Sequence, residues 1–86
     1  MKTELICKYD SRKSFYHKAI VEHYVSGELK LYSYNSLVAR LYRGKLKMVG
    51  PWDCSQTTRR HCKEFALQND VYDQYLEAKL EAKNAK

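Results

Sequence analysis

The chain lacks the long apolar segments that membrane and secreted proteins carry. No run of apolar residues approaches the ~20 that a membrane-spanning helix needs. Residues 1–5 contain no apolar signal core, so we expect a cytoplasmic protein with no membrane attachment. The three cysteines are too few and too scattered for a disulfide scaffold, and we expect them to be free thiols in a reducing compartment.

The chain also lacks internal repeats and low-complexity segments, and it is short. A chain of 86 residues forms one small domain with a thin core. One sheet covered by one or two helices suits this size. We therefore expect a single domain over residues 1–86, with the sheet in residues 1–50 and the helices in residues 55–83.

The residue spacings of a metal site or an active site are missing too. Zinc sites usually combine short paired spacings such as Cys-x-x-Cys, and the histidines and cysteines here form none. A nuclease would have to combine His61, Asp53, Glu64 and Arg59. No nucleophile, base and orienting group can be recognised there, and Arg60 with Glu64 has the spacing of an ordinary helical ion pair. We expect no metal, no cofactor and no enzymatic activity, and we expect His61 to bond Trp52 or a sheet backbone group.

The positive charge is concentrated in the first part of the chain. Residues 1–50 contain ten Lys and Arg and four Asp and Glu, a difference of +6, whereas residues 51–86 contain six of each. Six of the eight tyrosines also lie in residues 1–50. A localised positive field raises the rate of encounter with polyanions or acidic proteins. The alternative is that these cations keep a small sheet soluble and protect its edges.

Alternation of apolar and polar residues predicts five strands, over residues 3–9, 15–25, 29–34, 37–42 and 45–49. Short turns between them predict an antiparallel meander of four or five strands. Gly50-Pro51 ends the sheet, because proline lacks a backbone donor for the ladder. The residues expected to face the core are Leu29, Leu31, Ser33, Leu37, Ala39 and Leu41. The alternating residues expected to face solvent are Lys30, Tyr32, Tyr34, Val38, Arg40 and Tyr42.

The solvent-facing side of this sheet is the leading candidate site, because it sets cations among tyrosines. The candidate binding residues are Lys30, Tyr32, Tyr34, Arg40, Tyr42, Lys45 and Lys47. Such a surface can hold a phosphate chain and stack bases, or dock a partner that itself handles nucleic acid. Two interpretations compete with this one. Tyrosine is favoured in strands for packing alone, and a helix or a second copy of the chain could cover the face.

The helical half is predicted to contain two helices, which makes the fold class α+β. Ser55 or Thr57 is the expected N-cap of a helix that ends near Gln68. One face of that helix carries residues at helical spacing, namely Thr58, Cys62, Phe65 and Ala66. A second, C-terminal helix from Val71 to about Lys83 has an expected apolar stripe of Tyr72, Tyr75, Leu76 and Leu80. Residues 81–86 are expected to fray.

Arg59 and Arg60 form a second candidate site, near the start of the first helix. Backbone N–H groups and the helix dipole favour anions at such a position, and two arginines would reinforce a phosphate or carboxylate site. The alternative is a local salt bridge to Asp53.

Two segments, residues 31–39 and 55–68, resemble a family of small proteins encoded by phages and mobile elements of Gram-positive bacteria. That family shares a Ser-Tyr-x-Thr-x-Val strand followed by Ser-x-Thr-Thr-x-Arg-His-x-x-Glu-Phe at the start of a helix. The chain departs from the pattern at Ser36, where threonine is usual, and at Cys62 and Ala66, where larger aliphatic residues are expected. The resemblance implies a phage setting and a β-rich domain closed by a helix, and it implies no established activity.

The sequence therefore predicts a small non-enzymatic protein that binds nucleic acid, or a nucleic-acid-bound host protein, through the basic and aromatic sheet face. Phage proteins without catalytic residues often bind host machinery. The alternative function is thus an inhibitor of a host defence complex, of the anti-CRISPR kind, that acts by protein–protein contact. A homodimer that buries this face is a further alternative.

Overall fold

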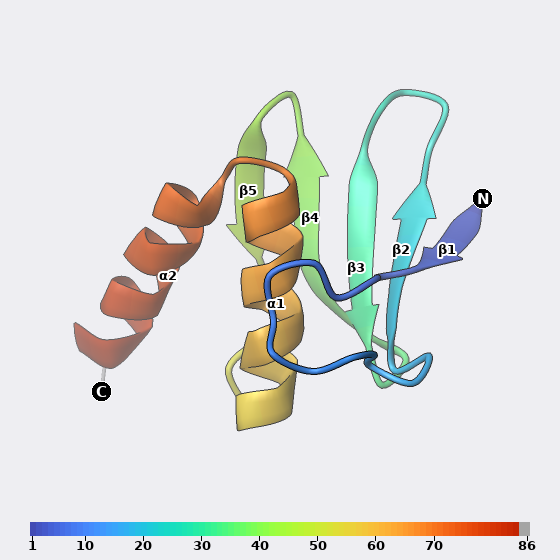
Figure 1. Ribbon diagram of the computed structural model, residues 1–86. Coiled ribbons are helices and arrows are strands. Elements are labelled where there is room, and N and C mark those ends of the chain that lie inside the picture. Colours follow the sequence, from blue (N-terminus) through green and yellow to red (C-terminus); the bar gives the residue numbers. More distant parts are fainter. Residues whose placement is uncertain (85–86) are drawn as a thin grey trace.

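A computed structural model describes residues 1–84 and shows an α+β fold, as predicted (Figure 1). Five antiparallel strands lie side by side in sequence order, and two helices follow them along the chain. The strands are β1 (Lys2–Glu4), β2 (Ala19–His23), β3 (Leu29–Ser33), β4 (Ser36–Tyr42) and β5 (Lys45–Met48). The helices are α1 (Gln56–Gln68) and α2 (Tyr72–Asn84). No helix of residues 1–84 is long and apolar enough to cross a membrane.

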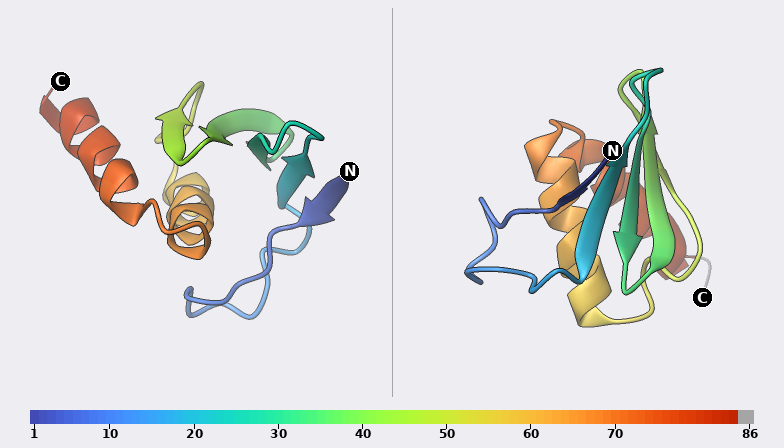
Figure 2. Two further views of the ribbon diagram at one scale, coloured as in Figure 1. Left: turned by 90° about the horizontal axis from the view of Figure 1, so that it is seen from above. Right: turned by 90° about the vertical axis from the view of Figure 1, so that its right-hand side faces the viewer.

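Helix α1 lies on one side of the sheet, α2 runs along the β5 edge, and no described segment covers the other side (Figure 2). Helix α1 packs on the inner face of the sheet, and α2 lies beside α1 and the β5 edge. The core between them is built mainly from apolar side chains of both layers, including Leu31, Val38, Ala39, Phe65 and Ala66. The second helix therefore does not cover the candidate face.

The first two strands are shorter than the alternation predicts. Residues 5–18 form a long connection that lies on the helix side of the sheet (Figure 1). Tyr16 and His17 have φ values of 51° and 64°, in the left-handed region that interrupts an extended strand. Leu5 and Phe15 of this connection are buried in the core, and the backbone of residues 8–10 between them bonds the Glu64 carboxylate.

A β-bulge between β3 and β4 changes which residues face the core. Leu31 pairs with Ala39, but the next residue, Tyr32, pairs with Leu37, so Val38 is the extra residue. Val38 is fully buried in the core, and Leu37 shares the outer face with its partner Tyr32. The prediction that Val38 points to solvent and Leu37 to the core was wrong, because strict alternation cannot continue through a bulge.

Helix α1 begins where the sequence predicts. The Ser55 hydroxyl accepts a hydrogen bond from the Thr58 backbone N–H at 3.1 Å, which caps the first turn. The expected inner face is confirmed, since Thr58, Cys62, Phe65 and Ala66 are all buried. Burial raises the pKa of the Cys62 thiol to about 12, so this cysteine packs as an apolar residue.

Helix α2 contacts the domain along a narrow line. Tyr75 is buried, but Leu76 and Leu80 are 44% and 59% exposed, so the predicted four-residue stripe was wrong for these two. The Gln74 side chain accepts from the Leu46 N–H at 2.8 Å and donates to the Gly44 carbonyl, which protects part of the β5 edge. The expected frayed tail is helical as far as Asn84, and residues 85–86 lie outside the described residues.

Candidate functional site

The outer face of the sheet is the side that faces away from α1. Directly paired residues of antiparallel strands share a face, so the pairing defines its rows. One row crosses all five strands through Lys2, Glu22, Lys30, Arg40 and Lys47. The next rows hold Glu4, Ile20, Tyr32 and Leu37 on one side and Tyr24, Glu28, Tyr42 and Lys45 on the other. Of the seven predicted sheet residues, six lie on this face.

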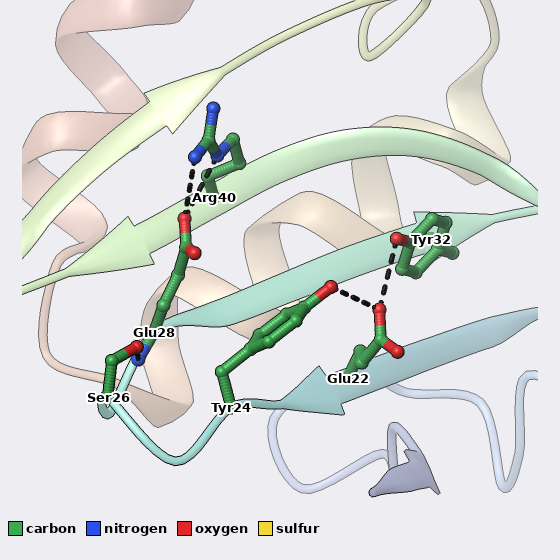
Figure 3. Close-up of polar contacts among 6 residues, drawn as sticks. All are labelled: Glu22, Tyr24, Ser26, Glu28, Tyr32 and Arg40. Atoms are coloured by element: carbon green, nitrogen blue, oxygen red, sulfur yellow. Dashed lines mark hydrogen bonds and ion pairs between the residues drawn. The ribbon is translucent and has the colours of Figure 1, made fainter.

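Glu22 organises the tyrosines of the outer face (Figure 3). Its Oε1 accepts from the Tyr24 hydroxyl at 2.6 Å and from the Tyr32 hydroxyl at 3.2 Å. The hydrogen bond from Tyr24 lowers the pKa of Glu22, and the same bond raises the pKa of Tyr24. Burial and the bond to Glu22 raise the pKa of Tyr32. Both hydroxyls therefore stay protonated and point at one carboxylate, which leaves the ring faces as the contact surface.

Cations lie over those ring faces. Lys30 Nζ is 4.8 Å from the Tyr24 ring centre, and Lys2 Nζ is 5.8 Å from that of Tyr32. Exposed cation–π contacts contribute about 0.5–1 kcal/mol, whereas stacking a base on an aromatic ring contributes about 1–3 kcal/mol. A base can therefore displace a lysine from its ring, and the displaced ammonium remains available for a phosphate.

Arg40 is held by an acidic partner on the same face. Its Nε and Nη2 lie 3.0 and 2.9 Å from Glu28 Oε2, and the Glu28 backbone N–H bonds the Ser26 hydroxyl (Figure 3). Lys45 and Lys47 are exposed and make no ion pair with any of residues 1–84. The cations most available to an external anion are thus at the β4–β5 side of the face.

Tyr34 does not join the outer face. It occupies the tight β3–β4 turn with a φ of 51°, and its ring centre lies 5.8 Å from that of buried His61, on the helix side. Lys18 Nζ lies 5.5 Å from the same ring. The alternation that placed Tyr34 outward ends at the turn, where the left-handed backbone redirects the side chain.

Arg59 and Arg60 lie on α1, so the structure separates them from the outer face. Arg59 Nη1 donates to the Asp53 carbonyl oxygen at 2.9 Å, and Arg60 Nη1 lies 3.6 Å from Asp10 Oδ1. The expected ion pair of Arg60 with Glu64 is not formed, because Glu64 is buried and accepts backbone N–H groups from the 5–18 connection. The nine predicted site residues therefore fall in different places: six on the outer face, Tyr34 in a turn, and two arginines on the helix.

The sequence prediction did not include several outer-face residues that make its polar and ring contacts, among them Lys2, Glu22, Tyr24 and Glu28. Glu22 lies in the strand expected over residues 15–25, so its strand could be predicted but its role could not. Its role depends on pairing with Lys2 on one side and Lys30 on the other, which only the register defines.

His61 belongs to the inner side of the sheet. It is fully buried, and its Nδ1 lies 2.8 Å from Ser33 Oγ, so the expected bond to Trp52 or to the sheet backbone was wrong. The Ser33 hydroxyl in turn donates to Thr58 Oγ1 at 3.2 Å. Burial lowers the pKa of His61 to about 4, so the ring is neutral at physiological pH. Among residues 1–84, no group of three or more His, Cys, Asp and Glu is placed to hold a metal.

A family model described as a family of unknown function, DUF8033, matches residues 1–81. The chain belongs to this family. No curated protein and no solved structure matches the chain. The match covers every strand, α1 and most of α2, so the DUF8033 domain is the fold described above. The description of the family names no activity.

Proposed function

We propose that this protein binds single-stranded nucleic acid, or a nucleoprotein that presents it, through the outer face of the sheet. One observation carries the proposal. The exposed lysines Lys45 and Lys47 lie on the outer face beside other cations and tyrosines, and no described segment covers this face. Cations supply phosphate contacts, and the ring faces of Tyr24, Tyr32 and Tyr42 supply stacking surface. No catalytic step is part of this proposal, and a phage setting remains an expectation from the resemblance.

Fluorescence anisotropy with labelled single-stranded and duplex DNA and RNA, at low and physiological salt, tests the proposal. We expect saturable binding to a single strand that weakens steeply with salt, because counterions are released when cations contact phosphates. Tyr32→Ala with Arg40→Ala should lower affinity by about tenfold, since one stacking surface and one cation are removed. Circular dichroism checks that the fold is intact. Unchanged affinity in this folded double variant would remove the outer face from consideration.

A second candidate function is inhibition of a host defence complex by protein–protein contact. It is favoured by the mixed charge of the face, where Glu4, Glu22 and Glu28 stand among five cations. A protein surface can match such alternating charges, whereas a polyanion is repelled by the carboxylates. Absence of nucleic-acid binding at low salt, together with a host partner whose binding depends on a few residues and weakly on salt, would favour this function.

A further inference from the structure

A cleft between α1 and α2 gathers cations away from the outer face. Two adjoining cavities of about 390 and 270 Å³ occupy it, and Arg59 and Lys79 line both. Lys83 and the half-buried Trp52 line the larger cavity, and Arg60 and Lys63 line the smaller. Among the described residues that line the two cavities, five are cationic and Asp53 is the only acid.

The charges of the cleft are largely available to a ligand. The bond from Arg59 to the Asp53 carbonyl positions the guanidinium through a neutral oxygen. Lys63 lies over the Tyr72 ring at 5.9 Å, a contact that leaves its ammonium exposed. Lys79 and Lys83 are exposed and form no ion pair with residues 1–84. Arg60 lies 3.6 Å from Asp10 in an ion pair, so its charge is partly engaged.

The charges of α2 are sorted between its two sides. Lys79 and Lys83 are four residues apart and line the cleft, whereas Glu77 and Glu81, also four apart, line the neighbouring groove against β5, which shares Trp52 and Ala82 with the cleft. An offset of two residues turns a helix by about 200°, so the two pairs lie on opposite sides. The balanced charge of residues 51–86 therefore hides a strongly positive cleft.

We infer that this cleft is a second binding site, for the linked phosphates of a single-stranded nucleic acid. The cations are distributed along two helices at one-turn intervals and do not converge on a point, which suits a chain of phosphates better than one isolated anion. Neighbours four residues apart on a helix lie about 5–6 Å from each other. The first turn of α1, which contributes Gln56, carries no acidic residue and adds its positive dipole end. This inference does not require the outer face to bind.

Three double variants with the same change in charge test the site. Lys79→Glu with Lys83→Glu reverses the cleft, and Lys45→Glu with Lys47→Glu reverses the outer face. Lys8→Glu with Lys13→Glu, on the exposed 5–18 connection, is the matched control for net charge. All six lysines are exposed, so each variant should fold, which thermal melting checks. Each is titrated against fluorescein-labelled oligo-dT over a range of salt concentrations.

We expect the cleft variant to lose about tenfold in affinity relative to the control, and its salt slope to fall by roughly 1.4, about 0.7 for each lost phosphate contact. A cleft variant that binds as tightly as the control, or a wild-type protein that does not bind oligo-dT, would overturn the inference. Loss in the cleft variant alone would support the cleft and count against the outer face. Loss of affinity in the outer-face variant alone would support the outer face and overturn the cleft. Loss of affinity in both variants would support both sites.

In a second measurement, inorganic tripolyphosphate competes with oligo-dT for the Lys45→Glu, Lys47→Glu variant. The cleft should yield to this base-free competitor because it recognises phosphates, whereas binding that depends on stacked bases should resist it. Backbone NMR shifts caused by tripolyphosphate should centre on Arg59 and Lys79. Shifts confined to other residues would overturn the assignment of the cleft.

Discussion

The two faces of the sheet use similar polar groups under opposite conditions. On the helix side of the sheet, Ser33, His61 and Glu64 are almost fully buried, and each makes at least one hydrogen bond, although His61 Nε2 has no partner among residues 1–84. On the outer face, Glu22 and Arg40 make the same kinds of bond, but Glu22 is only half-buried and Arg40 is exposed, so solvent reaches both. A buried polar group that loses its partner costs about 1–3 kcal/mol, whereas an exposed one is rehydrated. The inner groups therefore keep their partners as part of the fold, and the outer groups can exchange theirs for a ligand.

The largest expected effect is at Glu64, the buried acid that holds the 5–18 connection. Its carboxylate accepts the backbone N–H groups of Lys8, Tyr9 and Asp10 at 2.8–3.2 Å. Glu64→Ala should lower the free energy of unfolding by about 3–4 kcal/mol, because three donors lose a charged acceptor at once. Urea denaturation measures this loss of stability. Glu77→Ala, at an exposed position of α2, is the control and should change the free energy of unfolding by less than ~0.5 kcal/mol. A Glu64→Ala loss no larger than the control would show that the buried bonds between α1 and the 5–18 connection do not stabilise the fold in this way.

The second effect is a pH dependence that comes from His61. Its pKa is lowered to about 4 in the folded protein, from an ordinary value of 6.5, because burial disfavours the charged ring. Between these values the unfolded chain binds the proton and the folded one does not, so stability falls as pH decreases from 6.5 towards 4. The loss should reach roughly 3 kcal/mol at the lower end.

Denaturation at several pH values between 7 and 5 checks this slope, since the lowered pKa of Glu22 places its own titration below that range. His61→Phe should remove the slope whatever it does to the absolute stability. His17→Asn, at an exposed histidine, should retain it. A slope that survives in His61→Phe would assign the pH dependence to another group.

The third effect compares neighbours on opposite faces. Val38→Ala removes two methyl groups from the core and should cost about 2 kcal/mol, because a cavity remains. Leu37→Ala removes more atoms but from the half-buried outer face, and it should cost less than about 1 kcal/mol. Equilibrium unfolding of both variants measures the contrast. A larger loss for Leu37→Ala would mean that the bulge is absent and that strict alternation holds.

The bulge explains how far the sequence could predict this fold. Period-two patterns, turn residues and the Ser55 cap depend on nearby residues, so the sheet order, α1 and six of the outer-face residues could be predicted. Val38 could not, because a bulge is decided by how β3 and β4 pair. The prediction for Tyr34 was wrong for a related reason: this residue has a left-handed backbone in a turn, where side chains no longer alternate between the two faces as they do in a strand.

The candidate cleft was less visible from the sequence than the outer face. The sequence predicts Arg59 and Arg60 as one candidate site, but their separation from the sheet face follows from the packing of α1 on β3. Lys79 and Lys83 lie within residues 51–86, where positive and negative charges balance, so composition alone does not single them out. The signal that could have revealed them is the two-residue offset from Glu77 and Glu81, which places acids and bases on opposite sides of α2.

The smallest expected effect concerns the ion pair of Arg40 and Glu28. The two side chains are 46% and 19% exposed, so water screens their attraction. A double-mutant cycle with Arg40→Gln and Glu28→Gln should give a coupling of about 0.2–1 kcal/mol that shrinks in high salt. Such weak coupling is what allows Arg40 to leave Glu28 for a phosphate, because the exchange then requires little free energy. A coupling above about 2 kcal/mol would hold Arg40 to its partner as firmly as the buried groups are held, and it would remove this arginine from the binding face.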